Sequence, residues 1–201
     1  MNESRRLPTQ RRSRERVERL LGVSRDLIAA QGSEALRMSD VAQQAGVSIG
    51  SLYQYFPDKA AIIRALAERY NQEGRACVGT ALQAVATAPA LGPAMEQITD
   101  TYYAMFLAEP AMRDIWSGTQ ADKALQDMDL EDGRWHAACL AGTLRRLVPN
   151  IAGDIETRAF LLMYLLCSSV RLAVAMPREA GDALLAAFKQ VLRREVAALL
   201  S

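Results

Sequence analysis

The sequence predicts an all-α protein, and three observations support that prediction. Apolar residues recur three and four positions apart over most of the 201 residues, which is the period of an α-helix. Glycine and proline interrupt the pattern at the spacing expected between helices. No segment reads as a strand. Half of the residues are apolar and 23% are charged, as is typical of a soluble globular protein.

The first expected helix covers residues 12–31 and is preceded by a basic arm. Gly32 supplies the stop at its C-terminal end. The first 20 residues hold seven Arg against three Glu, a charge pattern that favours binding to the phosphates of nucleic acid. We expect residues 1–8 to be a disordered tail, and we expect Arg11, Arg12 and Arg14 to touch nucleic acid.

Residues 38–59 predict two short helices joined by a tight turn. Ser39 is the expected N-cap of the first helix, and Ser48 is the expected N-cap of the second. Gly46 lies between them, where a positive φ is needed. Leu52 and Phe56, four residues apart, form the buried stripe of the second helix. This layout is a helix-turn-helix, whose second helix enters the major groove of DNA.

The outward face of that second helix carries no charge. Gly50 and Gln54 point away from the buried stripe. The residues flanking them are Ile49, Ser51, Tyr53 and Tyr55. Glycine lets a backbone approach a base closely, glutamine can read adenine, and isoleucine can contact a thymine methyl. An alternative is an ordinary helical hairpin whose tyrosines face a protein partner.

The next helix begins with a lysine in an unfavourable place. Asp58 is its expected N-cap, which puts Lys59 in the first turn. The helix dipole disfavours a cation there, and a nearby DNA phosphate would offset that cost.

From Arg14 to about Tyr70 the chain resembles the TetR/AcrR family of bacterial transcriptional regulators. The resemblance rests on a first helix ending in AAQG, followed by MSDVAQQAGVSIGSLYQYFPDK, which contains the string A-G-V-S-x-G-x-L-Y-x-Y-F-x-x-K. It implies a DNA-binding domain over residues 1–59 and an all-helical ligand-binding and dimerisation domain over residues 60–201. By position in the family, the residues expected to face bases are Gly50, Tyr55 and Ile49, and those expected to contact phosphates are Ser39, Ser48, Ser51, Tyr53, Gln54 and Lys59. Ile49 departs from the family, because many relatives have lysine there.

The remainder of the chain predicts further helices. Their expected ranges are 58–86, 93–109, a shorter helix opened by Pro110, 122–148 with a possible interruption at DMDLEDG, 154–176 and 178–200. The family resemblance implies a small-molecule inducer pocket in this part of the chain. The candidate pocket residues are Tyr102, Phe106, Trp116 and Trp135. The alternative is that these aromatic residues are simply core.

The last two helices predict a homodimer. The stretch 160–170 is apolar nearly all round the helix, which is more than one core-facing side needs. Pairing with two-fold mates as a four-helix bundle would bury it, and the TetR family dimerises in this way. The expected interface residues are Leu162, Leu166, Val170, Leu185, Phe188 and Leu192. Such a dimer would bind a palindromic operator.

Other classes of function lack their residue patterns. His136 is the only histidine, and the cysteines Cys77, Cys139 and Cys167 form no CxxC, so we expect no metal site and no cofactor. No phosphate loop or nucleophile elbow is present, so we expect no catalytic residues and no enzyme. The Arg-rich N-terminus is no signal peptide, and the apolar run 159–170 is too short to span a bilayer. We expect a cytoplasmic protein without a membrane segment.

Two hypotheses of different class follow. The first is a ligand-responsive, DNA-binding transcriptional repressor released from its operator by a small apolar or amphipathic molecule. The alternative is a helical protein-interaction or ligand-binding module that does not bind DNA.

Overall fold

The structure is a computed structural model that describes residues 6–118, 122–149, 151 and 153–200. The regular elements of these residues are all helices, so the all-α prediction is confirmed. The chain divides into two compact units. The first holds the chain up to Arg69 together with Pro110–Gly118, and the second holds Tyr70–Glu109 and the chain from Thr119 onward.

The first unit is a small helical bundle. Its elements are α1 (Arg6–Gln31), α2 (Met38–Gln44), α3 (Ile49–Tyr53), the first part of α4 (Lys59–Gln83) and α6 (Pro110–Ser117). Its fully buried side chains include Leu20, Ile28, Leu52 and Ile62. α1 begins six residues earlier than expected. The expected tail at residues 1–8 falls partly outside the described residues.

The helix α6 is part of the first unit although it lies far along the chain. Pro110 opens it, as the sequence predicted. It packs against α1 and buries Met112, Ile115 and Trp116. The structure thus differs from the expected domain boundary after residue 59, because the first unit continues to Arg69 and includes a second segment. A unit of under 60 residues has little core of its own, and α6 adds apolar surface to it.

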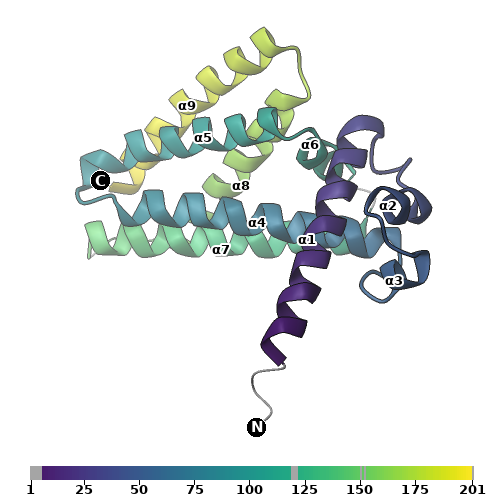
Figure 1. Ribbon diagram of the computed structural model, residues 1–201. Helices are drawn as coiled ribbons and strands as arrows, with labels where there is room; N and C mark the ends of the chain where they lie inside the picture. Colours follow the sequence, from purple (N-terminus) through teal and green to yellow (C-terminus); the bar gives the residue numbers. More distant parts are fainter. Residues whose placement is uncertain (1–5, 119–121, 150, 152, 201) are drawn as a thin grey trace. The chain divides into compact units, whose positions relative to one another are not determined.

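The second unit contains the remaining helices. After the end of α4 come a short 3-10 turn, η1 (Ala88–Ala90), then α5 (Leu91–Ala108), α7 (Lys123–Leu147), α8 (Ile155–Val174) and α9 (Arg178–Leu200). Figure 1 shows α4 running alongside α7 and α8 turning back into α9. The helix α8 packs against α5, α7 and α9, and the core of the unit lies between them.

The helix α7 is continuous through the DMDLEDG segment, where an interruption had been expected. The Asp122 carboxylate caps its start by accepting hydrogen bonds from the amides of Ala124 and Leu125. Gly133 belongs to the helix and is buried. A Cβ at Gly133 would lie 3.5 Å from the Phe160 ring, an ordinary van der Waals contact, so Gly133 packs against α8 and does not end α7.

One helix of the described residues, α8, is long and apolar enough to cross a membrane by length and composition. The apolar run 159–170 was expected to be too short to span a bilayer, but the helix that contains it, α8, covers 20 residues (Ile155–Val174). A core helix of a soluble protein passes the same test, and α8 packs against three other helices of its unit.

Candidate nucleic-acid interface

The turn between α2 and α3 is built by local contacts that the sequence largely indicated. Gly46 has a φ of 65°. Ser48 is the N-cap of α3, and its Oγ accepts a hydrogen bond from the Ser51 amide at 3.2 Å. The prediction that Ser39 caps α2 is wrong. The helix begins at Met38 with Arg37 as N-cap, and the Ser39 Oγ donates to Asp40 Oδ1 at 3.0 Å.

The two faces of α3 differ sharply in exposure. Leu52 and Phe56 are buried in the first unit. On the other side, Ile49 is 44% exposed and Tyr53 is 50% exposed. The remaining predicted contact residues of this segment are also accessible: Ser48, Gly50 and Gln54 are exposed, and Ser51 and Tyr55 are half-exposed. The structure therefore brings the predicted residues of α3 to one accessible surface.

Gly50 has no role in the contacts of its own unit. A Cβ at this position would meet no atom within 4 Å, and its φ is not positive. Neither close packing nor backbone conformation therefore requires glycine here. A close approach by a partner molecule would be a reason for glycine at this position.

Lys59, another predicted DNA contact, is the first residue of α4. Asp58 caps α4 as predicted, because its Oδ1 accepts from the Ala61 amide at 2.7 Å. The Lys59 ammonium donates to the Glu34 carbonyl oxygen at 2.9 Å, which directs it toward the α1–α2 turn. An ammonium has three protons, so two remain for further acceptors.

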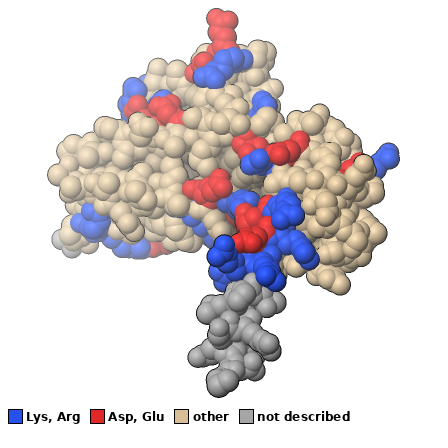
Figure 2. All heavy atoms as spheres, in the orientation of Figure 1, with Lys and Arg blue, Asp and Glu red and all other residues tan. Residues whose placement is uncertain are grey.

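The first half of α1 carries exposed arginines. Arg11, Arg12 and Arg14 are all exposed, as are Arg16 and Arg19. Figure 2 shows Lys and Arg side chains gathered around this part of α1, with carboxylates among them. Arg11 is paired with Glu15 at 2.8 Å, which offsets part of its charge. The predicted basic arm is thus a helical surface in the described residues.

The predicted pocket residues do not come together as one site within the second unit. Tyr102 and Phe106 meet edge-to-face on α5, with ring centroids 5.1 Å apart. Trp135 lies on α7, 36% exposed, against Gly79 of α4. Trp116 is buried in the first unit, whereas the other three candidates lie in the second. It belongs to the short helix α6, which sequence reasoning had assigned to the C-terminal domain.

A set of charged residues lies inside the second unit, and sequence reasoning missed it. Asp132 of α7 accepts from the Arg75 guanidinium of α4 at 2.6 Å and lies 3.4 Å from His136 Nδ1. One turn earlier on α7, Asp129 pairs with Arg171 of α8 at 2.7 Å. Burial raises the pKa of Asp132, against the opposing effects of His136 and Arg75, and burial lowers the pKa of His136. These residues fall on one face of α7, a spacing that was visible in the sequence.

The cysteines are free thiols in the structure. Burial raises the pKa of Cys77 and of Cys139, and it raises the pKa of Cys167 to about 12. A thiol that stays protonated is a poor nucleophile.

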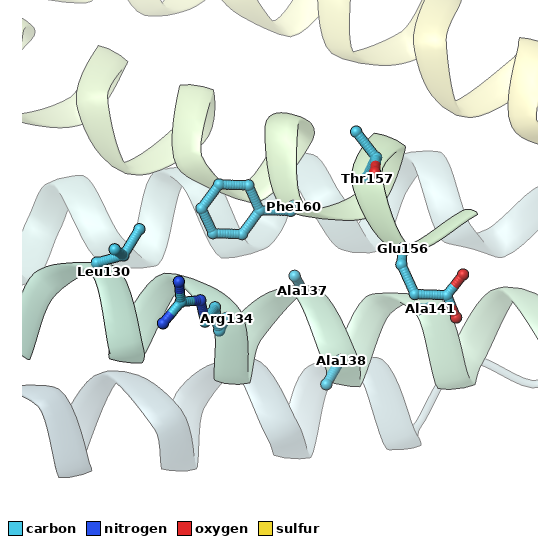
Figure 3. Close-up of a pocket in the computed structure, with 8 residues that line it drawn as sticks. All are labelled: Leu130, Arg134, Ala137, Ala138, Ala141, Glu156, Thr157 and Phe160. Atoms are coloured by element: carbon cyan, nitrogen blue, oxygen red, sulfur yellow. The ribbon is translucent and has the colours of Figure 1, made fainter. Parts of the chain in front are cut away.

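A groove lies between α7 and α8 on the second unit (Figure 3). Its volume is about 390 Å³. Ala137, Ala138 and Ala141 of α7 form its small-residue side, with Leu130 and Phe160 beside them. The groove also contains Arg134, Glu156 and Thr157. Its lining is mainly apolar, with a cationic and an anionic side chain at different points along it.

The predicted dimer residues mostly face the core of a single chain, which corrects that prediction. Leu162, Leu166, Val170, Leu185 and Leu192 are buried within the unit, and Phe188 is half-buried. The neighbouring positions on α8 are the accessible ones: Leu161 is 57% exposed, Leu165 42% and Leu172 54%. The run is apolar all round, so periodicity could not tell which side packs inward.

A helix-turn-helix unit with an accessible second helix, joined to a larger helical unit, defines a DNA-binding regulator of transcription. Residues 20–66 match the family model of the bacterial regulatory proteins, tetR family, and residues 89–200 match the tetracyclin repressor-like C-terminal domain. The chain belongs to the TetR family of transcriptional regulators. The resemblance noted in residues 14–70 is confirmed.

Individual relatives agree with this assignment. The HTH-type transcriptional repressor KstR of Rhodococcus jostii (strain RHA1) is 38% identical over 60 residues, a match that spans 29% of this chain and 28% of that repressor. A TetR-family transcriptional regulator from Streptomyces coelicolor shares the fold with a TM-score of 0.71 and 24% identity, over 94% of this chain and 99% of that one. The regulator FadR from Bacillus subtilis, solved in complex with stearoyl-CoA, has a TM-score of 0.69 and 18% identity, over 89% of this chain and 97% of that one.

Proposed function

We propose that the protein is a ligand-responsive repressor that binds a palindromic operator as a homodimer. The observation that carries the proposal is the exposed, uncharged face of α3, where Ile49 and Tyr53 remain accessible and Gly50 has open space before it. A face that only met solvent would more often be charged. An enzyme or metal-dependent activity finds no support in the residues described above.

The roles of the interface residues divide by chemistry. Ile49, Gly50 and Tyr55 face base edges, where an apolar side chain and a missing Cβ favour close contact. Phosphate contacts fall to Ser39, Ser48, Ser51, Tyr53, Gln54 and Lys59, with Arg11, Arg12 and Arg14 of α1 adding positive charge. Phosphate contacts set register and affinity, while the base contacts set sequence preference.

The homodimer is supported by the exposed stripe on α8, defined here as Leu161, Leu165 and Leu172. Three exposed leucines on one helical face form an apolar surface that a second copy would cover. Val191 of α9 is also half-exposed and adds to the apolar surface of the two helices. In a two-fold pair each stripe would meet its own copy.

The ligand would bind in the second unit, where Tyr102, Phe106 and Trp135 supply aromatic surface. FadR of Bacillus subtilis was solved with stearoyl-CoA, an amphipathic molecule, and this supports an apolar or amphipathic inducer for the present chain. The ligand would act by favouring a conformation that fits DNA poorly. The protein would work in the cytoplasm, where operator DNA is found.

Selection from a random duplex library tests the DNA part of the proposal. The wild-type protein is expected to enrich a palindrome whose half-sites are about one helical turn apart, or a small multiple of it. Enrichment of no sequence would contradict the proposal. Stearoyl-CoA is the first inducer probe, and release of the selected duplex by this compound would support an amphipathic ligand.

A further inference from the structure

The turn between α1 and α2 is closed by a carboxylate from α6. Gly32 follows the last residue of α1 with a φ of 82°, and its amide donates to the Ile28 carbonyl at 2.8 Å. The next amide, that of Ser33, has no helical carbonyl to meet. It donates to Asp114 Oδ2 at 2.7 Å, across 81 positions of the sequence.

The electrostatics of this contact are unusual. Asp114 brings a negative charge to the C-terminal end of α1, where the helix dipole disfavours it. A hydrogen bond from an amide to a carboxylate is stronger than one between neutral groups, which offsets that cost. Gly32 also makes room for it, because a Cβ there would lie 3.2 Å from Asp114 Oδ1. The local sequence is therefore fitted to receive the carboxylate.

The same turn holds the predicted phosphate ligand. The carbonyl of Glu34, one residue after Ser33, accepts from the Lys59 ammonium at 2.9 Å. Two peptide groups of one short turn are thus bonded on one side to Asp114 of α6 and on the other to Lys59 of α4. Fixing the Ser33 amide restricts the Glu34 carbonyl, and this carbonyl orients the ammonium.

We propose that Asp114 is a positioning residue for DNA binding, which holds the α1–α2 turn so that Lys59 is presented to a DNA phosphate. The proposal rests on the proposed function. In sequence, α6 stands between α5 and α7, and both of those helices belong to the second unit.

The test compares full-length variants on the duplex selected by the wild-type protein, using fluorescence anisotropy over a range of salt. D114A removes the acceptor, and D114N keeps an oxygen that can accept from Ser33. S117A is the matched control, because Ser117 lies on the same helix and bonds only to the Asp114 backbone carbonyl among the described contacts. D114A is expected to weaken binding about 10-fold and to lower the salt slope by about one. D114N and S117A should stay within about threefold of wild type.

A double-mutant cycle separates positioning from general stabilisation. If Asp114 acts through Lys59, D114A adds little to the loss already caused by K59A. Independent, additive losses would overturn the proposal, as would a D114A variant that melts at a lower temperature but binds DNA with unchanged affinity and slope. A loss in D114N as large as that in D114A would also overturn it. If D114A does not fold, D114S, whose shorter side chain falls short of Ser33, replaces it in the same cycle. Absence of binding by the wild-type protein would instead refute the proposed function, and this inference with it.

Discussion

Substitution of Gly50 by alanine separates the fold from the proposed DNA contact. The added methyl group meets no atom within 4 Å in the free protein, and the residue does not use a positive φ. Alanine is favoured over glycine in a helix by up to about 1 kcal/mol. For a chain of this size, 1 kcal/mol raises the melting temperature by about 2–4 °C. G50A should therefore be as stable as the wild type, or slightly more stable.

The same substitution should weaken binding to the operator. If the backbone at Gly50 approaches a base or phosphate, the methyl group disrupts contacts comparable to those lost at a mismatched base pair, about 1–3 kcal/mol per half-site. That corresponds to about a 5- to 150-fold loss of affinity for each half-site, and the two losses multiply in a dimer bound to a palindrome. Thermal melting and fluorescence anisotropy on the selected duplex measure the two effects. Binding of G50A with wild-type affinity would refute the argument that open space at Gly50 is reserved for DNA.

Three further perturbations probe other parts of the protein. K59A should weaken binding to all duplexes and lower the salt slope by about one unit, and an unchanged slope in anisotropy titrations would remove Lys59 from the phosphate contacts. L165E should convert the dimer to a monomer in light-scattering measurements, because it places a charge on the exposed stripe of α8. The control A104E, on the exposed side of α5, should leave the dimer intact. A dimeric L165E would show that the interface lies elsewhere. His136 has a pKa lowered by burial, so the unfolded chain takes up its proton first as the pH falls below about 6.5, and stability is lost there. H136Q removes this titration and should lose less melting temperature than wild type between about pH 7.5 and pH 5.5; equal losses would show that His136 does not titrate as described.

The sequence predicted the helix-turn-helix well because its determinants are local. A cap at Ser48, a positive φ at Gly46 and the buried pair of Leu52 and Phe56 all act within a few residues, and each is present in the structure. The cap at Ser39 failed because the helix starts two residues earlier, with Arg37 as its N-cap. A shift of two residues at a helix end is within the ordinary uncertainty of boundaries.

Features that depend on tertiary contacts were less accessible from the sequence. The sequence could not show which side of α8 faces the core, since both sides are apolar. Residues predicted to lie in the dimer interface, such as Leu166, are buried in the core of the unit. The assignment of α6 to the first unit depends on its contact with α1, about 80 residues away. The acidic DMDLEDG segment suggested a break because charged residues are rarely buried. Only part of it faces inward: Asp132 is buried and paired with Arg75, Asp129 is half-buried and paired with Arg171, and Asp127 and Glu131 remain exposed.

The central claim is that this TetR-family chain binds DNA with sequence preference through α3. The measurement that tests it most directly is fluorescence anisotropy with the DNA upstream of the protein's own gene, at two salt concentrations, with a scrambled duplex as control. Tight binding to the upstream duplex, weaker binding to the scrambled one and a steep loss with salt are the predicted results. Failure to bind either duplex at low salt would contradict the claim and favour a helical module that acts through other partners.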